Sequence, residues 1–183
     1  MKRRIFSTLL AAAILNGPLP AFAQASTPSA SQIERSLDAP VAKQKQRVPV
    51  REFKRRPELR RQAPSINIQS INFAFGSAAI SPSQYDKIDN IATAMERILR
   101  RDPEARFLIE GHTDAVGSFG SNLRLSDARA AALRSTLVRE FGVPRYVLET
   151  VGYGEEYLLV PTQNENWRNR RVTLRRIDAF VAF

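Results

Sequence analysis

The residues best suited to chemistry stand in the stretch "LIEGHTDAVGS", where His112, Thr113 and Asp114 follow an apolar run. A histidine beside a carboxylate could activate a nearby serine, but the chain has no G-x-S-x-G nucleophile motif. A single histidine without any cysteine also argues against a zinc site. We therefore expect no enzyme, no metal and no cofactor. Ligand binding and a plain turn remain as alternatives, and His112 is interpreted as a strand-end residue whose ring packs or hydrogen-bonds locally.

The hydrophobic pattern from residue 66 onward predicts the elements that would position these side chains. Alternating apolar residues predict strands at residues 66–75, 106–112, 147–154 and 170–177. Apolar residues three and four positions apart predict helices at residues 82–101 and 123–141. A capping box is expected at residues 81–84, and Asn122 and Ser126 are expected to cap the second helix. The order β-α-β-α-β-β indicates a domain that mixes helices and strands, α/β in the broad sense and α+β in the strict one. Its helices are expected to pack on one mixed sheet.

Two loops are expected at the same edge of this sheet. They are "FGSAAIS", after the first strand, and "GHTDAVGS", after the second. Because the carboxyl ends of parallel strands meet at one edge, and ligands often bind there, the two loops are predicted to form the binding site.

The charge of the chain is concentrated outside the predicted domain. The formal net charge is +10, but residues 66–183 carry 15 basic and 14 acidic side chains. Residues 24–65 carry ten basic and four acidic side chains together with five prolines. This distribution excludes nucleic acid as the expected partner, because a nearly neutral domain offers no basic surface for a phosphate backbone.

The N-terminal third is expected to be a leader and a tether. Residues 1–23 have the basic start, apolar run and small residues of a signal peptide cleaved after Ala23. An uncleaved leader would instead tether the protein to the inner membrane. Residues 24–65 are predicted to be a disordered linker, since their apolar content is too low to offset the ordering entropy. The basic stretch at residues 50–62 is either a solvated tether or a weak contact with an anionic surface.

Five motifs in one order resemble a known family. "INFAFGSAAIS", "IEGHTDAVGS", "NLRLSDARAAAL", "VGYGEE" and "NRRV" are similar to the OmpA-like C-terminal domain found in OmpA, Pal and MotB. The likeness spans residues 66–177, and we set the domain at residues 66–183. The resemblance implies non-covalent binding of peptidoglycan through the meso-diaminopimelate of its stem peptide, in the periplasm and in association with the outer membrane. The alternative is an envelope assembly or interaction subunit that uses the fold to contact another protein.

The resemblance also implies a binding site. In the family, the aspartate of GHTD takes the ammonium of diaminopimelate and the arginine of the LS-x-x-RA motif takes the carboxylate, which would be Asp114 and Arg129 here. Backbone amides of the first loop would complete the carboxylate shell. The full expected ligand-binding set is Asp114, Arg129, Phe75, Gly76, Ser77, Ala78, Thr113, Asn122 and Leu125. Lysine lacks the second carboxylate, so a lysine-type stem should bind more weakly.

Two departures from the family pattern stand beside this site. Gly76 occupies a position that is acidic in many relatives, which removes a side-chain contact but lets the backbone approach a ligand. Trp167 is unusual before the last strand, where its indole could cover the core or touch glycan. Asn169 and Arg170 of "NRRV" are expected to be positional, either holding the last strand or helping Asp114.

Overall fold

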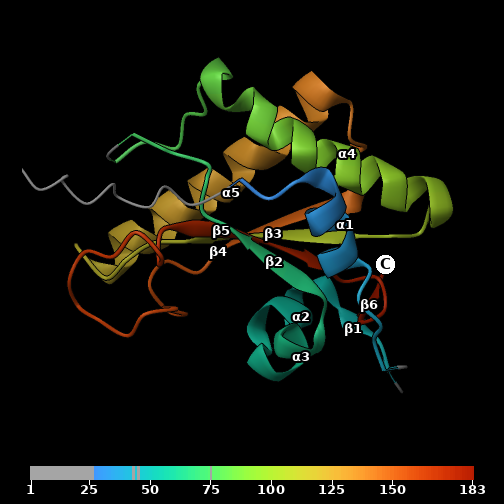
Figure 1. The fold of residues 1–183 in the computed structure, drawn as a ribbon. Helices are drawn as coiled ribbons and strands as arrows, with labels where there is room; N and C mark the ends of the chain where they lie inside the picture. The colour runs from blue at the N-terminus through green and yellow to red at the C-terminus, as the bar shows by residue number, and fades with distance from the viewer. Residues whose placement is uncertain (1–26, 43, 45, 75) are drawn as a thin grey trace, which may run out of the picture.

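The sheet of the domain has four strands in mixed orientation. The computed structural model describes residues 27–42, 44, 46–74 and 76–183, so the expected signal peptide at residues 1–23 lies outside the described residues. The strand order is β2-β5-β3-β4. Their bounds are β2 Ser65–Ile68, β3 Phe107–His112, β4 Leu148–Gly152 and β5 Arg171–Arg176. The predicted α+β class with one mixed sheet is confirmed (Figure 1).

The strand directions place the two predicted loops together. β5 is antiparallel to both β2 and β3, and β3 is parallel to β4. β2 and β3 therefore run in the same direction, and their carboxyl ends lie at one edge of the sheet. The segments that follow β2 and β3 therefore leave the sheet at this edge, as the sequence predicted.

Two long helices cover one face of the sheet (Figure 1). They are α4 Tyr85–Arg101 and α5 Phe119–Phe141. Ile88, Ile91 and Met95 of α4 are fully buried against the apolar side chains of the strands. α5 lies so close to β3 that a Cβ on Gly111 would overlap the carbonyl oxygen of Ser126. This close approach fixes α5 over the end of β3, from which the candidate site begins.

The opposite face is covered by residues that precede the sheet in the chain. Figure 1 shows α2 Val50–Arg55 and α3 Pro57–Gln62 on this side, next to the short parallel pair of β1 Val48–Pro49 and β6 Val181–Ala182. Phe53 of α2 packs with Leu108 of β3 and with Phe180 in a second apolar core. Both faces of the sheet are thus buried, which is why every residue of β3 is buried.

The N-terminal segment differs from the predicted disordered linker at residues 24–65. Besides α2 and α3, it forms α1 Ala30–Leu37, which begins at a capping box on Ser29. Ala30, Ile33 and Leu37 have helical spacing and are buried in the main core. The average composition concealed these few apolar residues. Proline was also misleading, because Pro57 stands at the start of α3, where its missing N–H costs nothing.

Several helices and strands begin or end at residues other than those predicted. The strand expected at residues 66–75 ends at Ile68, and residues 69–74 have no regular structure. Ser81 caps a short 3-10 turn at Pro82–Gln84, while the Gln84 side chain accepts a hydrogen bond from the amide of Asn72 instead of closing a capping box. A second 3-10 turn, Arg145–Val147, leads into β4. These changes leave the order of the main elements as predicted.

The start of α5 also differs from the prediction. Ser118 caps the helix, and its hydroxyl accepts from the amide of Ser121. Asn122 and Ser126, which were expected to be caps, lie inside the helix and are buried. Their side chains serve the loops instead, since the Ser126 hydroxyl accepts a hydrogen bond from the amide of Gly154.

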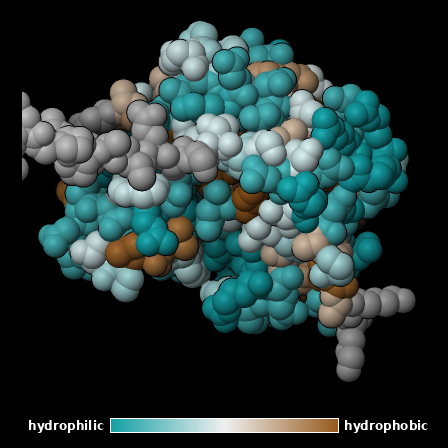
Figure 2. All heavy atoms as spheres, viewed as in Figure 1, coloured by the Kyte–Doolittle hydropathy of each residue, from teal (hydrophilic) through white to brown (hydrophobic). Residues whose placement is uncertain are grey.

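The surface of the protein is more polar than the two apolar cores. Figure 2 shows one face that is mostly hydrophilic, with apolar side chains gathered in small patches. No helix in the described part of the chain is long and apolar enough to cross a membrane.

Candidate functional site

Asp114 lies two residues beyond the end of β3 and is held from several directions. Its Oδ2 accepts a hydrogen bond of 2.8 Å from Nη1 of Arg170, and its Oδ1 accepts one of 3.4 Å from the amide of Val116. The residue is 7% exposed. A carboxylate has about four lone-pair directions, so Asp114 retains capacity for a further donor.

Arg170 and Asn169 position this carboxylate and the last strand. Arg170 bridges Asp114 and Glu165, with a distance of 2.6 Å to the second carboxylate. Asn169 is fully buried, and its amide exchanges two hydrogen bonds of 2.9 Å with the backbone of Val160. Both residues therefore have the positional contacts expected from the sequence, and Arg170 contacts the predicted ligand residue directly.

Arg129 reaches the same place from α5. Its Nε donates to the carbonyl oxygen of Ser77 at 3.1 Å, and its guanidinium lies 4.9 Å from the centre of the Phe73 ring. Burial lowers the pKa of Arg129, and the charge of Arg170 lowers it further, while Asp114 opposes the shift. Every acidic side chain of the protein is at a described residue, and none forms an ion pair with Arg129. The guanidinium is thus a largely desolvated cation that would gain from a carboxylate.

The loop after β2 contributes differently from the prediction. Phe75 lies outside the described residues. Gly76 is exposed at a φ of 65°, a conformation that favours glycine. The amide of Ser77 donates to the carbonyl of Ala74 at 3.0 Å, so this amide is already used within the turn. Ser77 serves the site through its carbonyl on Arg129, and Ala78 is half-buried beside it.

Three other residues, Asn122, Thr113 and Leu125, complete the predicted contact set. The amide group of Asn122 donates to the carbonyl oxygens of Asp114 and Val116 at 3.3 and 3.2 Å, which ties the loop to α5. Thr113 is buried, and its backbone amide donates to the carbonyl of Gly154. Leu125 is half-buried on α5. Thr113 and Asn122 are therefore placed to hold Asp114 from behind, and their burial leaves little surface for a ligand.

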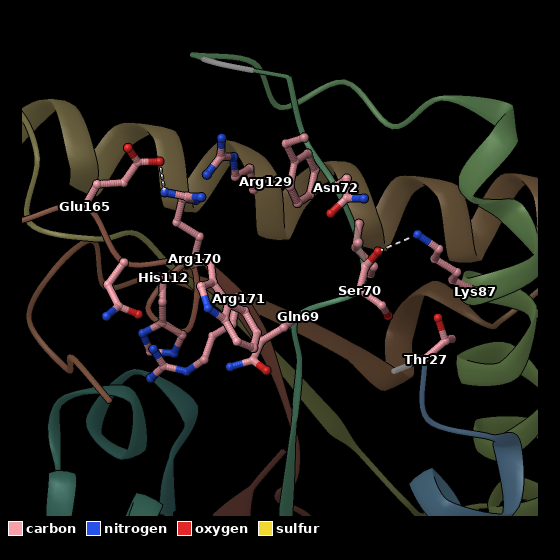
Figure 3. A pocket seen from close by; sticks show the side chains of 14 residues that line it. Thr27, Gln69, Ser70, Asn72, Lys87, His112, Arg129, Glu165, Arg170 and Arg171 are labelled. Atoms are coloured by element: carbon pink, nitrogen blue, oxygen red, sulfur yellow. Dashed lines mark hydrogen bonds and ion pairs between the residues drawn. The ribbon is translucent and has the colours of Figure 1, made fainter. Parts of the chain in front are cut away.

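A cleft of about 780 Å³ opens beside these charges. Its lining includes Arg129 and Arg170 at one end and Lys87 with Ser70 at the other (Figure 3). Phe73 also lines the cleft, with its ring next to the Arg129 guanidinium. Asp114 is not part of this lining and reaches the cleft through its ion pair with Arg170. This volume is in the range of ligand-binding clefts in proteins. Trp167 is 47% exposed on the rim, so it faces the cleft and not the core.

A buried ionic cluster lies under the site and was missed by the sequence analysis. Glu110 accepts two hydrogen bonds from Arg60, at 3.0 and 3.1 Å, and two from Arg175, at 2.9 and 3.2 Å. The Arg60 guanidinium also lies 3.8 Å from the centre of the Tyr153 ring. Burial alone would raise the pKa of Glu110, but His112 and the two guanidinium groups outweigh it and hold that pKa far below its usual range. The available signal was a glutamate in a strand that is otherwise apolar.

His112 belongs to this buried cluster. Its ring is 2% exposed and stacks on Tyr153, with 5.7 Å between ring centres. Its Nε2 lies 3.7 Å from Oε2 of Glu110, close enough to influence that carboxylate but beyond hydrogen-bond distance, and neither ring nitrogen has a hydrogen-bond partner among the described residues. Burial lowers the pKa of His112 from 6.5 to about 4, and the nearby Arg171 adds to the effect. The histidine is therefore a neutral, packed residue, as expected for a strand end.

This lowered pKa predicts a loss of stability in mild acid. The unfolded state binds a proton near pH 6.5 and the folded state only near pH 4, so stability falls as the pH drops through this window. We expect a loss of about 2 kcal/mol in the free energy of unfolding by the middle of the window. Glu110 adds a loss only below its unfolded pKa of 4.5.

Urea unfolding at a series of pH values measures this effect. A His112→Phe variant should keep the stacking on Tyr153 and show little change above about pH 5.5, where Glu110 is still largely ionised in the unfolded state. A wild-type protein as stable near pH 5 as at neutral pH would contradict the assigned burial of a neutral His112.

Residues 72–172 match the model of the OmpA family. The chain belongs to the OmpA family. The resemblance inferred from the motifs is confirmed, and members of the family are structural or binding proteins and not enzymes. No three His, Asp or Glu side chains lie close enough to hold a metal ion within the described ranges.

Individual relatives support the family assignment. The chain is 34% identical over 111 residues to outer membrane porin F of Pseudomonas aeruginosa, a match that covers 61% of this chain and 30% of the porin. It is 32% identical to the peptidoglycan-associated lipoprotein of Pseudomonas aeruginosa, over 60% of this chain and 62% of the lipoprotein. The chain thus spans less than two thirds of the length of these curated relatives.

Solved structures agree on the fold. The periplasmic domain of Helicobacter pylori MotB matches with a TM-score of 0.51 at 22% identity, over 61% of this chain and 74% of that domain. At this level of identity, the match concerns the fold alone. The N-terminal helices α1, α2 and α3 lie before the residues that match the family model.

Proposed function

We propose that the protein binds peptidoglycan non-covalently through the meso-diaminopimelate of its stem peptide, and so anchors an envelope protein or complex to the cell wall. One observation carries this proposal. Arg129 lines the same cleft as Arg170, which pairs with Asp114, and Arg129 has no ion-pair partner among the described residues. The names of the relatives, among them a peptidoglycan-associated lipoprotein and several outer membrane proteins, support a place in the cell envelope.

The chemistry of the ligand matches the two charges. The free end of meso-diaminopimelate carries an ammonium and a carboxylate on one carbon. Asp114 would accept the ammonium with the lone pairs that Arg170 and Val116 leave open, and Arg129 would receive the carboxylate. Each charge-assisted hydrogen bond contributes about 1.5 to 3 kcal/mol. The orientation of both groups is fixed in advance, since Ser77 holds Arg129 and Asn122 holds the loop of Asp114.

Sedimentation with purified wall sacculi tests the proposal. The wild-type protein is expected in the pellet and an Asp114→Ala, Arg129→Ala double variant in the supernatant. The double variant should unfold in urea close to the wild-type midpoint, which separates lost binding from lost folding. Wall binding that survives the double change would overturn the proposed site.

A further inference from the structure

The cleft extends well beyond the two residues proposed to bind diaminopimelate. Figure 3 shows Arg129 and Arg170 at one end, Asn72 between, and Lys87 with Ser70 at the other end. Four cations, Lys87, Arg129, Arg170 and Arg171, line the cleft, and Glu165 is the one acidic residue in its described lining. The lining thus carries an excess of positive charge. A zwitterion at the first end would leave that excess unchanged, because its own net charge is zero.

Two cations of the cleft, Arg171 and Lys87, are left unexplained by the proposed function. The guanidinium of Arg171 is buried and donates to neutral acceptors of Asn67, Asn169 and Tyr157. Lys87 is half-buried at the far end of the cleft. Its ammonium donates to the carbonyl oxygen of Ser70 at 2.7 Å and to Oε1 of Gln84 at 3.0 Å, which are both neutral acceptors. No carboxylate of the described residues, which include every acidic side chain of the protein, forms an ion pair with it. Two anchoring bonds fix the ammonium in place and leave its third N–H for a ligand.

Ser70 supplies a second, independent sign of an unfilled site. The residue lines the cleft next to Lys87, is 4% exposed, and its hydroxyl has no hydrogen-bond partner among the described residues. A buried hydroxyl without a partner costs free energy, so such groups normally meet a ligand or a water. The hydroxyl and the ammonium together offer two donors to one acceptor group at this end of the cleft.

We propose that Lys87, with Ser70, binds a second carboxylate of the same stem peptide. This inference rests on the proposed function. In a diaminopimelate stem, the residue before diaminopimelate is a glutamate linked through its side chain, so its α-carboxylate is free. With the diaminopimelate end held by Asp114 and Arg129, the preceding residue extends into the rest of the cleft. Lys87 lies in that part of the cleft without an anion. Its contact with the glutamate carboxylate would let the site recognise two residues of the peptide.

Three ligands separate this contact from diaminopimelate binding. They are free meso-diaminopimelate, the tripeptide L-Ala-γ-D-Glu-meso-diaminopimelate, and the same tripeptide with its glutamate α-carboxylate amidated. Calorimetric titration should show the wild-type protein binding the acid tripeptide roughly 5- to 10-fold more tightly than the amide, as expected for one charge-assisted contact at a half-exposed site. Lys87→Gln should bind the two tripeptides equally and keep its affinity for free meso-diaminopimelate.

Lys54→Gln is the matched control, because Lys54 lies under the opposite face of the sheet and pairs with Glu149. It should retain the wild-type preference for the acid tripeptide. Equal wild-type binding of acid and amide, with normal binding of meso-diaminopimelate, would overturn the role of Lys87 alone. A preference that persists in Lys87→Gln would do the same. Failure of the wild-type protein to bind any of the three ligands would overturn the proposed function and this inference with it.

Discussion

Replacing Glu110 with glutamine is expected to lower the free energy of unfolding by about 3 to 5 kcal/mol, the cost of removing one partner from a buried ion pair. The carboxylate is 1% exposed and balances the guanidinium groups of both Arg60 and Arg175. Glutamine has nearly the same shape, but its neutral amide would leave two buried cations without an anion. The shift of the urea unfolding midpoint, followed by circular dichroism, measures this loss.

Glu149→Gln provides the control for this prediction. Glu149 pairs with Lys54 at 2.8 Å, but both side chains are partly exposed. Such a pair contributes at most about 1 kcal/mol, because water screens it. Similar losses in the two variants would contradict the assignment of the Glu110 cluster as the polar contact that holds α3 against the sheet.

Replacing Asp114 with asparagine should weaken binding of meso-diaminopimelate by roughly 10- to 100-fold, the equivalent of one charge-assisted hydrogen bond. Asparagine retains the size of the side chain but loses the charge that attracts the ammonium. Calorimetric titration of the variant with meso-diaminopimelate measures the change. Asp127→Asn is the control, since Asp127 is exposed on α5 and should leave the affinity unaltered. Wild-type affinity in Asp114→Asn would show that the ammonium binds elsewhere.

The predictable part of the fold was the part with strong periodicity. The residues that form α4 and α5 include apolar side chains at helical spacing. Those that form β3 and β5 contain continuous or alternating apolar runs. It was also predictable that the segments after β2 and β3 leave the sheet at one edge, because the two strands run in the same direction. The resemblance then assigned roles that spacing alone could not.

The unpredicted part depends on contacts between segments distant in sequence. Arg60 looked like one more charge of a basic tether, but its partner Glu110 lies 50 residues away. The ion pair between Glu110 and Arg175 likewise joins residues 65 positions apart. Local composition carries no information about such pairs. The helices α2 and α3 were missed for the same reason, since what stabilises them is the sheet face that they cover.

We expect Arg129 to bind the carboxylate that distinguishes a diaminopimelate stem from a lysine stem, and the proposed function depends on this contact. Titration of the wild-type protein and an Arg129→Ala variant with the stem peptide L-Ala-γ-D-Glu-meso-diaminopimelate-D-Ala and with its lysine counterpart, in which only the ε-ammonium of lysine is free, tests it directly. The wild-type protein should prefer the diaminopimelate peptide by roughly tenfold or more, as expected for one charge-assisted contact to a desolvated guanidinium. The variant should bind both ligands weakly and equally. Equal wild-type affinities for the two ligands, or a preference that persists without Arg129, would contradict the account.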